Sequence, residues 1–173
     1  MHELTEVVFR RLQGGRVGLS TSSLTTFKKY RQLRVTDREA GGVLIGRLVT
    51  DAVDLMVDTA TVPARSDLRQ RFRFFRKASS AQGQVDRAWV SSSGTQNYLG
   101  EWHSHPEDDP LPSPMDVENW HRIVSSASFE QAFLLFVIVG RRSLGMWELS
   151  RKLDLVRLSE ERSNQVRGGP TES

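Results

Sequence analysis

The sequence of 173 residues contains no cysteine and no long apolar stretch. The absence of cysteine excludes disulfide bonds and thiolate-ligated metal sites, and it is typical of proteins in a reducing cytoplasm. No apolar run approaches the roughly 20 residues that a membrane-spanning helix needs. The first residues, Met1–Leu4, include an acid and lack the apolar segment of a signal peptide. We therefore expect a cytoplasmic protein that does not bind a membrane.

The chain also lacks a strong charge of either sign, because its net charge is only +3 and its isoelectric point is near 9.7. This mild basic excess permits an acidic partner, but it is weak support for binding nucleic acid, which we do not expect. A hydrophobic content of 38% is enough for a packed core, and the length suits one domain. We predict a single domain over residues 1–158, followed by a polar, disordered C-terminal tail over residues 159–173.

Hydrophobic periodicity predicts strands and helices that follow one another irregularly along the chain. Expected strands cover residues 3–12, 41–49, 53–62, 98–105, 133–139, 145–149 and 153–158, and expected helices cover residues 20–33, 79–90 and 113–126. The strand at 133–139 is apolar throughout, which is typical of the centre of a sheet. Helices on either side of such a sheet predict the α/β class and a sandwich architecture.

A basic run between residues 65 and 77 interleaves arginine with phenylalanine. Arg71 and Arg73 alternate with Phe72 and Phe74, which predicts a strand with one solvated and one packed face. A solvated strand edge is the simplest interpretation of this run. The alternative is an edge that docks an extended peptide by strand addition.

Two histidines, His103 and His105, lie at the end of a predicted strand and precede a loop, residues 106–112, that contains three prolines. Side chains two apart on a strand point to the same face, so both imidazoles can reach one ion. The loop can turn the chain back and bring Asp116 towards them. Two histidines and one carboxylate leave the fourth position of a tetrahedral Zn²⁺ site open, which is the catalytic pattern. We therefore predict a zinc site.

Each of these residues also has a simpler interpretation. Ser113, Pro114 and Asp116 form a good helix start, with a serine cap, a proline in the first turn and an acid at the third position. A histidine pair alone is more often a surface feature. The four polar residues together at these spacings favour a metal site. Trp120, four residues after Asp116 on the same helix face, is expected to form a wall of the site.

The spacing His103-x-His105, seven residues, Ser113, two residues, Asp116 resembles the JAMM motif of the JAB/MPN metallopeptidases, which remove ubiquitin-like modifiers. That family has a glutamate before a glycine-rich apolar run, and Glu39 precedes such a run here. The resemblance implies that His103, His105 and Asp116 are metal ligands. It also implies that Glu39 and Ser113 are catalytic, with Glu39 moving protons and Ser113 binding the developing oxyanion.

The resemblance extends from about Ser20 to about Leu155 and implies a three-layer α-β-α sandwich with a mixed sheet, of the cytidine-deaminase-like type. The sequence Gly-Glu-Trp-His-Ser-His-Pro-Glu, residues 100–107, is similar to a bacterial branch found in antiphage (CBASS) operons. Members of that branch hydrolyse the bond that joins the C-terminus of a cyclic-oligonucleotide synthase to its targets. The implied substrate is a protein that presents an extended C-terminal tail.

Other assignments stay open at this level. Glu101 shares the strand face of His103 and is the nearest competitor of Glu39 for the role of base, whereas the acids at 107, 108 and 109 are interpreted as solvated loop residues. The same site can process the precursor of a sulfur-carrier or ubiquitin-like protein. A non-catalytic MPN scaffold that binds a partner is a rival of a different class, but such scaffolds lack the ligands. The RadC-like branch usually has an N-terminal DNA-binding region, for which this chain has little room.

Overall fold

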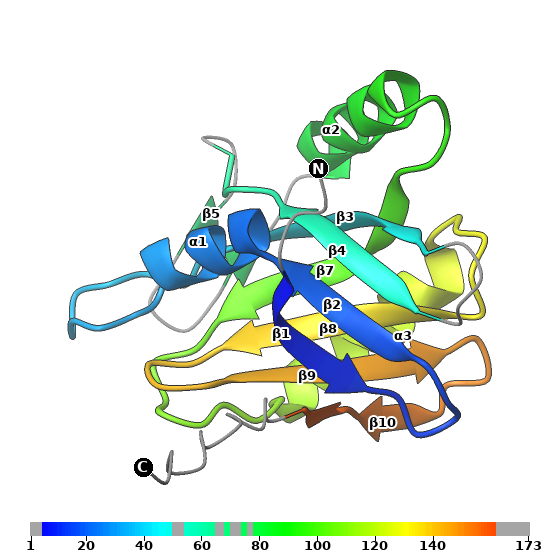
Figure 1. Ribbon diagram of the computed structural model, residues 1–173. Coiled ribbons are helices and arrows are strands. Elements are labelled where there is room, and N and C mark those ends of the chain that lie inside the picture. Colours follow the sequence, from blue (N-terminus) through cyan, green and yellow to red (C-terminus); the bar gives the residue numbers. More distant parts are fainter. Residues whose placement is uncertain (1–4, 50–53, 65–67, 70–73, 76–77, 162–173) are drawn as a thin grey trace, which may run out of the picture.

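The computed structural model describes the chain except residues 1–4, 50–53, 65–67, 70–73, 76–77 and 162–173 (Figure 1). The described residues form a nine-stranded sheet, a separate two-stranded sheet and three helices. The strands are β1 (Thr5–Arg10), β2 (Arg16–Ser20), β3 (Gly41–Leu48), β4 (Leu55–Ala60), β5 (Leu68–Arg69), β6 (Phe74–Phe75), β7 (Asn97–Ser104), β8 (Phe133–Val139), β9 (Leu144–Ser150), β10 (Leu155–Arg157) and β11 (Ser159–Glu160), and the helices are α1 (Thr21–Lys29), α2 (Ala78–Ser91) and α3 (Pro114–Ser126).

The large sheet is mixed, as predicted, with the strand order β10-β9-β8-β7-β3-β4-β2-β1-β11. The pairs β7–β8 and β2–β4 are parallel, and the other pairs are antiparallel. Every residue of β8 is buried, which confirms its predicted central place. Strand β7, which contains His103, and strand β3, which begins just after Glu39, are neighbours at the middle of the sheet.

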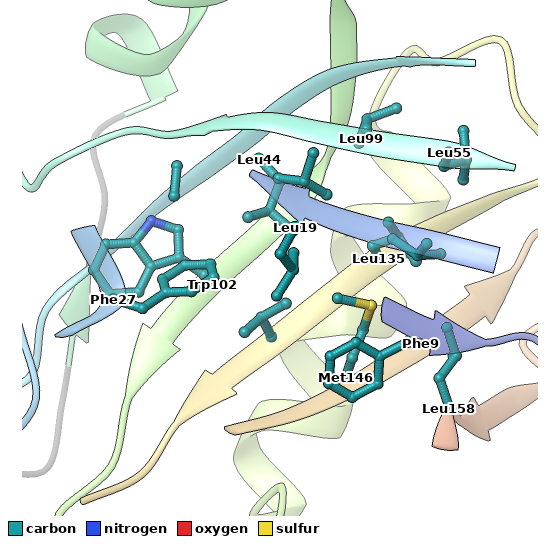
Figure 2. Packing of buried hydrophobic residues seen from close by; sticks show 14 of the residues in the cluster. Phe9, Leu19, Phe27, Leu44, Leu55, Leu99, Trp102, Leu135, Met146 and Leu158 are labelled. Atoms are coloured by element: carbon teal, nitrogen blue, oxygen red, sulfur yellow. The ribbon is translucent and has the colours of Figure 1, made fainter. Parts of the chain in front are cut away.

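The three layers are confirmed by the way that successive residues of β8 divide between two cores. Leu135 and Val137 pack with Phe27 of α1 and with Trp102 on one face (Figure 2). The residues between them on the strand, such as Phe136, pack with α3 on the opposite face. Helix α2 covers β3 on the α3 side, where Val43 and Ile45 meet Ala81. The sheet therefore separates α1 from α2 and α3.

The N-terminal part differs from the expected pattern in one strand and one helix end. Residues Arg16–Ser20 form β2, which was not predicted, because Gly14 and Gly15 adopt φ values of 95° and 89° and turn the chain back on β1. The predicted helix over 20–33 is too long. It begins after the N-cap Ser20 but ends at Lys29, and Leu33 is 65% exposed.

The C-terminal strands connect the two edges of the large sheet. β10 pairs with β9 at one end and β11 pairs with β1 at the other, and only Leu158 separates them. Leu158 is buried and its N–H donates to the Met146 carbonyl over 2.9 Å. The predicted tail boundary at residue 158 is therefore too early, because Ser159–Glu160 pair in the sheet. The rest of the predicted tail, residues 162–173, lies outside the described residues.

Two further sequence interpretations concern the surface. Residues 71–73 of the predicted alternation lie outside the described residues, and Phe74 belongs to β6, which pairs antiparallel with β5. Among the helices that the structure describes, none is both long and apolar enough to cross a lipid bilayer.

Candidate metal centre

Strand β7 places both histidines on the α3 side of the sheet. His103 is opposite Gly41 on β3 and beside Ile138 on β8, so its backbone is held from both sides. Trp102 and Ser104 point to the opposite face and are 1% and 0% exposed. The strand alternation therefore brings the two imidazoles together, and their Nε2 atoms lie 3.0 Å apart.

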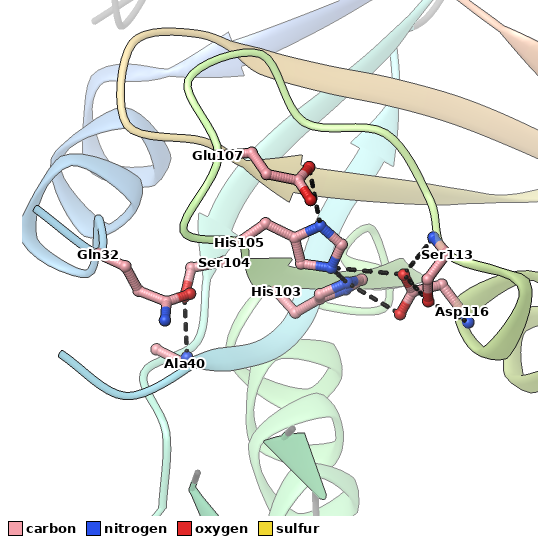
Figure 3. A network of polar contacts seen from close by, with 8 residues as sticks. All are labelled: Gln32, Ala40, His103, Ser104, His105, Glu107, Ser113 and Asp116. Atoms are coloured by element: carbon pink, nitrogen blue, oxygen red, sulfur yellow. Dashed lines mark hydrogen bonds and ion pairs between the residues drawn. The ribbon is translucent and has the colours of Figure 1, made fainter. Parts of the chain in front are cut away.

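The start of α3 supplies the third polar group. Asp116 Oδ1 lies 3.2 Å from His103 Nε2, and Asp116 Oδ2 lies 3.4 Å from His105 Nε2 (Figure 3). The same carboxylate forms a capping box, in which it accepts from the Ser113 N–H over 2.7 Å while the Ser113 hydroxyl accepts from the Asp116 N–H over 3.1 Å. The capping interpretation is confirmed, and the cap aims Asp116 at the histidines.

The proline-rich loop is fixed against the turn that follows β8. The Arg141 N–H donates to the Glu107 carbonyl over 2.7 Å, and Asp108 pairs with the Arg141 side chain over 2.8 Å. Gly140 is required here, because a Cβ atom at this position would lie 2.6 Å from Pro110 Cδ and 2.7 Å from the Asp108 carbonyl oxygen. This close packing fixes the loop that leads from His105 to the start of α3.

The three side chains fit a divalent metal ion. Among the described residues, His103, His105 and Asp116 are the group whose ligand atoms all lie within 4.8 Å of one another. Ligand atoms around a tetrahedral zinc with bonds of about 2.0–2.1 Å are about 3.3 Å apart. The two Nε2 atoms are 3.0 Å apart, and Asp116 presents Oδ1 3.2 Å from His103 Nε2 and Oδ2 3.4 Å from His105 Nε2. The donor set and its spacing therefore suit a metal ion.

The second nitrogen of His105 supports the same conclusion. His105 Nδ1 is buried and has no hydrogen-bond partner in the described part of the chain, and it lies 3.7 Å from Glu107 Oε2. An imidazole that binds a metal through Nε2 keeps its proton on Nδ1, and a nearby carboxylate commonly orients such a ring. Of the three loop acids, Glu107 is thus directed at a candidate ligand, whereas Asp108 pairs with Arg141 and Asp109 accepts from the Ser143 hydroxyl.

The electrostatic environment of the cluster favours the ionised form of the Asp116 carboxylate. Burial alone would raise the pKa of Asp116, but hydrogen bonds from His103, His105 and Ser113 lower it well below its ordinary value. Burial opposes protonation of His105, yet the hydrogen bond with Asp116 and the surrounding negative charges raise the pKa of its imidazole. A bound cation would satisfy the same excess of negative charge.

Glu39 reaches the cluster from a different part of the chain. It lies just before β3 and is only 6% exposed. Burial raises the pKa of Glu39 to about 7, and the charges of His105, Asp116 and Glu107 also act on it. A carboxyl group with a pKa near neutrality can both accept and release a proton at physiological pH. The competing acid, Glu101, accepts instead from the Tyr98 hydroxyl over 3.3 Å.

Trp120, which was expected to form a wall of the site, lies near His103 and belongs to the buried core. Its ring centroid lies 6.4 Å from that of His103, and it stacks on Phe136 with centroids 4.7 Å apart. Trp120 is only 2% exposed, so it packs beneath the imidazole as part of the core.

Sequence reasoning missed the buried Gln32, which contacts Ser104 between the two histidines (Figure 3). A lone glutamine carries no spacing signal that could have identified it.

Comparison with known proteins gives one family. The family described as prokaryotic homologs of the JAB domain matches residues 29–152. A Pseudomonas aeruginosa protein named CD-NTase/cGAS isopeptidase is 39% identical over 125 residues, which are 72% of this chain and 77% of the relative. Proteins of the same name from Vibrio cholerae and Escherichia coli are 38% and 33% identical, over 86% and 82% of this chain and 91% and 86% of their own length.

A solved structure supports the fold. The solution structure of a protein from Desulfitobacterium hafniense superposes with a TM-score of 0.55, over 83% of this chain and 88% of that protein. Their sequences are 18% identical, so this likeness concerns the fold alone.

Proposed function

Because this chain belongs to the family of prokaryotic JAB-domain homologues, we propose that it is a zinc-dependent isopeptidase that releases the C-terminus of a CD-NTase from lysine side chains of other proteins. Membership confirms the resemblance on which the sequence prediction rested. The names of the three relatives support a hydrolase of this substrate class. The activity would reverse a conjugation step in bacterial antiphage defence.

The observation that carries the proposal is the juxtaposition of a metal-ligand cluster with a buried glutamate. His103, His105 and Asp116 would hold the zinc ion, and Glu39 acts on their cluster electrostatically although it is far from it in sequence. A zinc ion held there would supply Lewis acidity and would lower the pKa of a bound water molecule towards about 7. Glu39 is the buried carboxyl group that interacts with this cluster and can take up and release a proton.

Glu39 serves both proton transfers of the hydrolysis. As water adds to the scissile carbonyl carbon, Glu39 takes up one of its protons. It then gives this proton to the leaving nitrogen of the lysine side chain, because an amine is a poor leaving group until it is protonated. The pKa near 7 suits a group that must be a base in the first step and an acid in the second.

Ser113 is proposed to donate its hydroxyl to the oxyanion that forms on the scissile carbonyl. In the structure this hydroxyl donates to Asp116 Oδ2 over 2.7 Å, so it must rotate about its Cα–Cβ bond or its C–O bond to serve the substrate. Loss of one oxyanion donor commonly costs about 10²–10³ in rate. The capping role and the catalytic role thus use the same oxygen atom.

The direct test uses a peptide with the C-terminal sequence of a CD-NTase, joined through its terminal carboxyl group to the ε-amino group of a fluorescent lysine peptide. We expect the zinc-loaded protein to release the lysine peptide, and a matched linear fusion shows whether an ordinary peptide bond is also cleaved. Cleavage of the linear fusion alone would favour processing of a ubiquitin-like or sulfur-carrier precursor. If neither probe is cleaved, the chain is better regarded as a partner-binding scaffold.

Zinc is expected to stabilise the folded protein, because an ion that binds only the native state shifts the folding equilibrium. At a free zinc concentration about a hundred times the Kd, the gain is about 2.7 kcal/mol, which raises Tm by about 5–10 °C for a chain of this length. Thermal unfolding with added zinc, and again with excess chelator, measures the effect. His121→Ala changes a histidine outside the ligand cluster and is the matched control. An equal gain in His103→Ala would place the ion elsewhere.

Ser113→Gly separates the two roles of this serine. Glycine is a tolerated N-cap, so the helix should lose only a few tenths of a kcal/mol, whereas the hydroxyl is lost completely. We expect kcat to fall by about 10²–10³ with little change in Tm. Ser113→Ala should show the same loss of kcat together with a decrease of about 1 kcal/mol in stability. Full activity of Ser113→Gly would leave capping as the sole function of this residue.

A further inference from the structure

Glu39 is carried by the connecting segment between α1 and β3, which contains no helix or strand. Residues 31–40 lead from α1 to β3, and residues 33–36 are exposed. A local turn closes this segment, in which the Asp37 N–H donates to the Arg34 carbonyl over 3.0 Å. The position of Glu39 therefore depends on how the residues on either side of it are anchored.

One anchor holds Ala40 against the strand that carries the histidines. The Ser104 N–H donates to the Ala40 carbonyl over 2.8 Å, and the Ala40 N–H donates to the Ser104 hydroxyl over 2.9 Å. Ser104 lies between His103 and His105, and its side chain is on the opposite face of β7. This anchor fixes the backbone next to Glu39 relative to both candidate ligands.

Gln32 completes the arrangement with both ends of its amide. Its Oε1 accepts from the Ser104 hydroxyl over 3.2 Å (Figure 3). Its Nε2 donates to the Asp37 carbonyl over 3.3 Å. The side chain is 1% exposed. An amide buried in this way is costly unless it is hydrogen-bonded, and here both polar atoms are used.

We propose that Gln32 is a positioning residue that holds Glu39 in place relative to the cluster of His103, His105 and Asp116. It does so by bonding to residue 37 on one side of Glu39 and, through Ser104, to residue 40 on the other. This inference rests on the proposed function, in which Glu39 moves protons. A displacement of about 1 Å in a catalytic group can cost about 10² in rate, so a residue that touches no substrate can still control kcat.

Gln32→Met tests the proposal, because methionine has a similar length and volume but cannot make either hydrogen bond. We expect kcat on the isopeptide-linked CD-NTase peptide to fall by about 10–10²-fold. KM should stay within about twofold, and zinc content and zinc affinity should match the wild type, because neither substrate nor ligands are touched. A kcat within about twofold of wild type in the folded, zinc-loaded variant would overturn the proposal, as would a loss of activity explained by lost zinc.

Gln96→Met is the matched control. Gln96 also donates a hydrogen bond from a half-buried amide, to Asp58 Oδ2 over 3.0 Å, but it lies just before β7, at the end of the strand that is away from the histidines. This variant should retain kcat within about twofold. If Gln96→Met lost as much kcat as Gln32→Met, the loss would reflect a general decrease in the rigidity of the fold. That result would overturn the positioning role.

A second pair of measurements keeps the inference testable if Gln32→Met does not fold. Ser104→Ala removes the hydroxyl that links Gln32 to Ala40 and should lower kcat in the same way, with zinc retained. In a Glu39→Gln background, either change should cause little further loss, because both act through Glu39. An inactive wild type would contradict the proposed function itself, whereas an active wild type with unaffected Gln32 and Ser104 variants would contradict only this inference.

Discussion

Glu39→Gln is expected to give a folded, zinc-loaded protein that hydrolyses the isopeptide probe at least about 10³-fold more slowly than wild type. A single general acid–base group commonly contributes about 10²–10⁴, and Glu39 is proposed to serve two proton transfers. Glutamine keeps the shape and burial of the side chain, which is 6% exposed, but it cannot take up a proton. Rate measurements under single-turnover conditions, with zinc measured in the same samples, separate chemistry from metal binding.

Glu101→Gln is the matched control for this result. Glu101 is on the same strand as His103, yet it accepts from the Tyr98 hydroxyl, and it was the competing candidate for the base. We expect its replacement to change the rate by no more than about threefold. An active Glu39→Gln protein beside an inactive Glu101→Gln protein would reverse the assignment.

The part of the site that lies close together in sequence could be predicted from the sequence. Strand alternation puts His103 and His105 on one face, and this is a local rule that needs no knowledge of the fold. The helix that begins at Ser113 could likewise be recognised from its capping residues. The structure places all of these groups as expected, within 3.4 Å of one another at their closest ligand atoms.

The place of Glu39 could not be derived in the same way. Its neighbour Ala40 is anchored to Ser104, a contact between residues 64 positions apart, and periodicity carries no information about such pairs. The assignment of Glu39 came from the family resemblance alone. Gln32 had no such support, although its two hydrogen bonds help to bring these distant segments together.

Two short strands, β2 and β11, show the same limit. The sequence does not predict β2, because a five-residue strand between the Gly14–Gly15 turn and α1 resembles a loop. The paired residues Ser159–Glu160 were assigned to the tail because they are polar and exposed, and only their pairing with β1 distinguishes them from it. Short strands depend on their partners for stability, so their own residues predict them poorly.

The capping box also explains why two interpretations of the same residues were equally good. Ser113 and Asp116 satisfy the free N–H groups at the start of α3, and the same carboxylate faces both imidazoles. A cap is a rigid way to present a carboxylate, because Asp116 Oδ2 accepts from both the backbone N–H and the hydroxyl of Ser113. Helix stability and metal binding are therefore coupled at Asp116, and a test of the ligand must separate them.

His103→Ala is expected to abolish zinc binding and hydrolysis together. Loss of one of three protein ligands should weaken zinc by more than the 10–100-fold that is typical of losing a supporting residue around the ligands. Purified His103→Ala should therefore contain almost no zinc, where wild type contains about one ion per chain. His103 makes no capping contact, so the helix α3 should remain intact, and metal analysis after dialysis measures the loss directly.

Asp116→Asn extends this test to the third ligand while sparing the cap. Asparagine retains a side-chain oxygen that can accept from the Ser113 N–H, an interaction of 2.7 Å in the structure, but it lacks the charge that attracts a cation. We expect zinc to be lost with little change in the Tm of the zinc-free protein, whereas Asp116→Ala should lose zinc and also about 1 kcal/mol of helix capping. Zinc retained in both His103→Ala and Asp116→Asn would mean that the cluster is a capping arrangement and that the metal, if any, is held elsewhere.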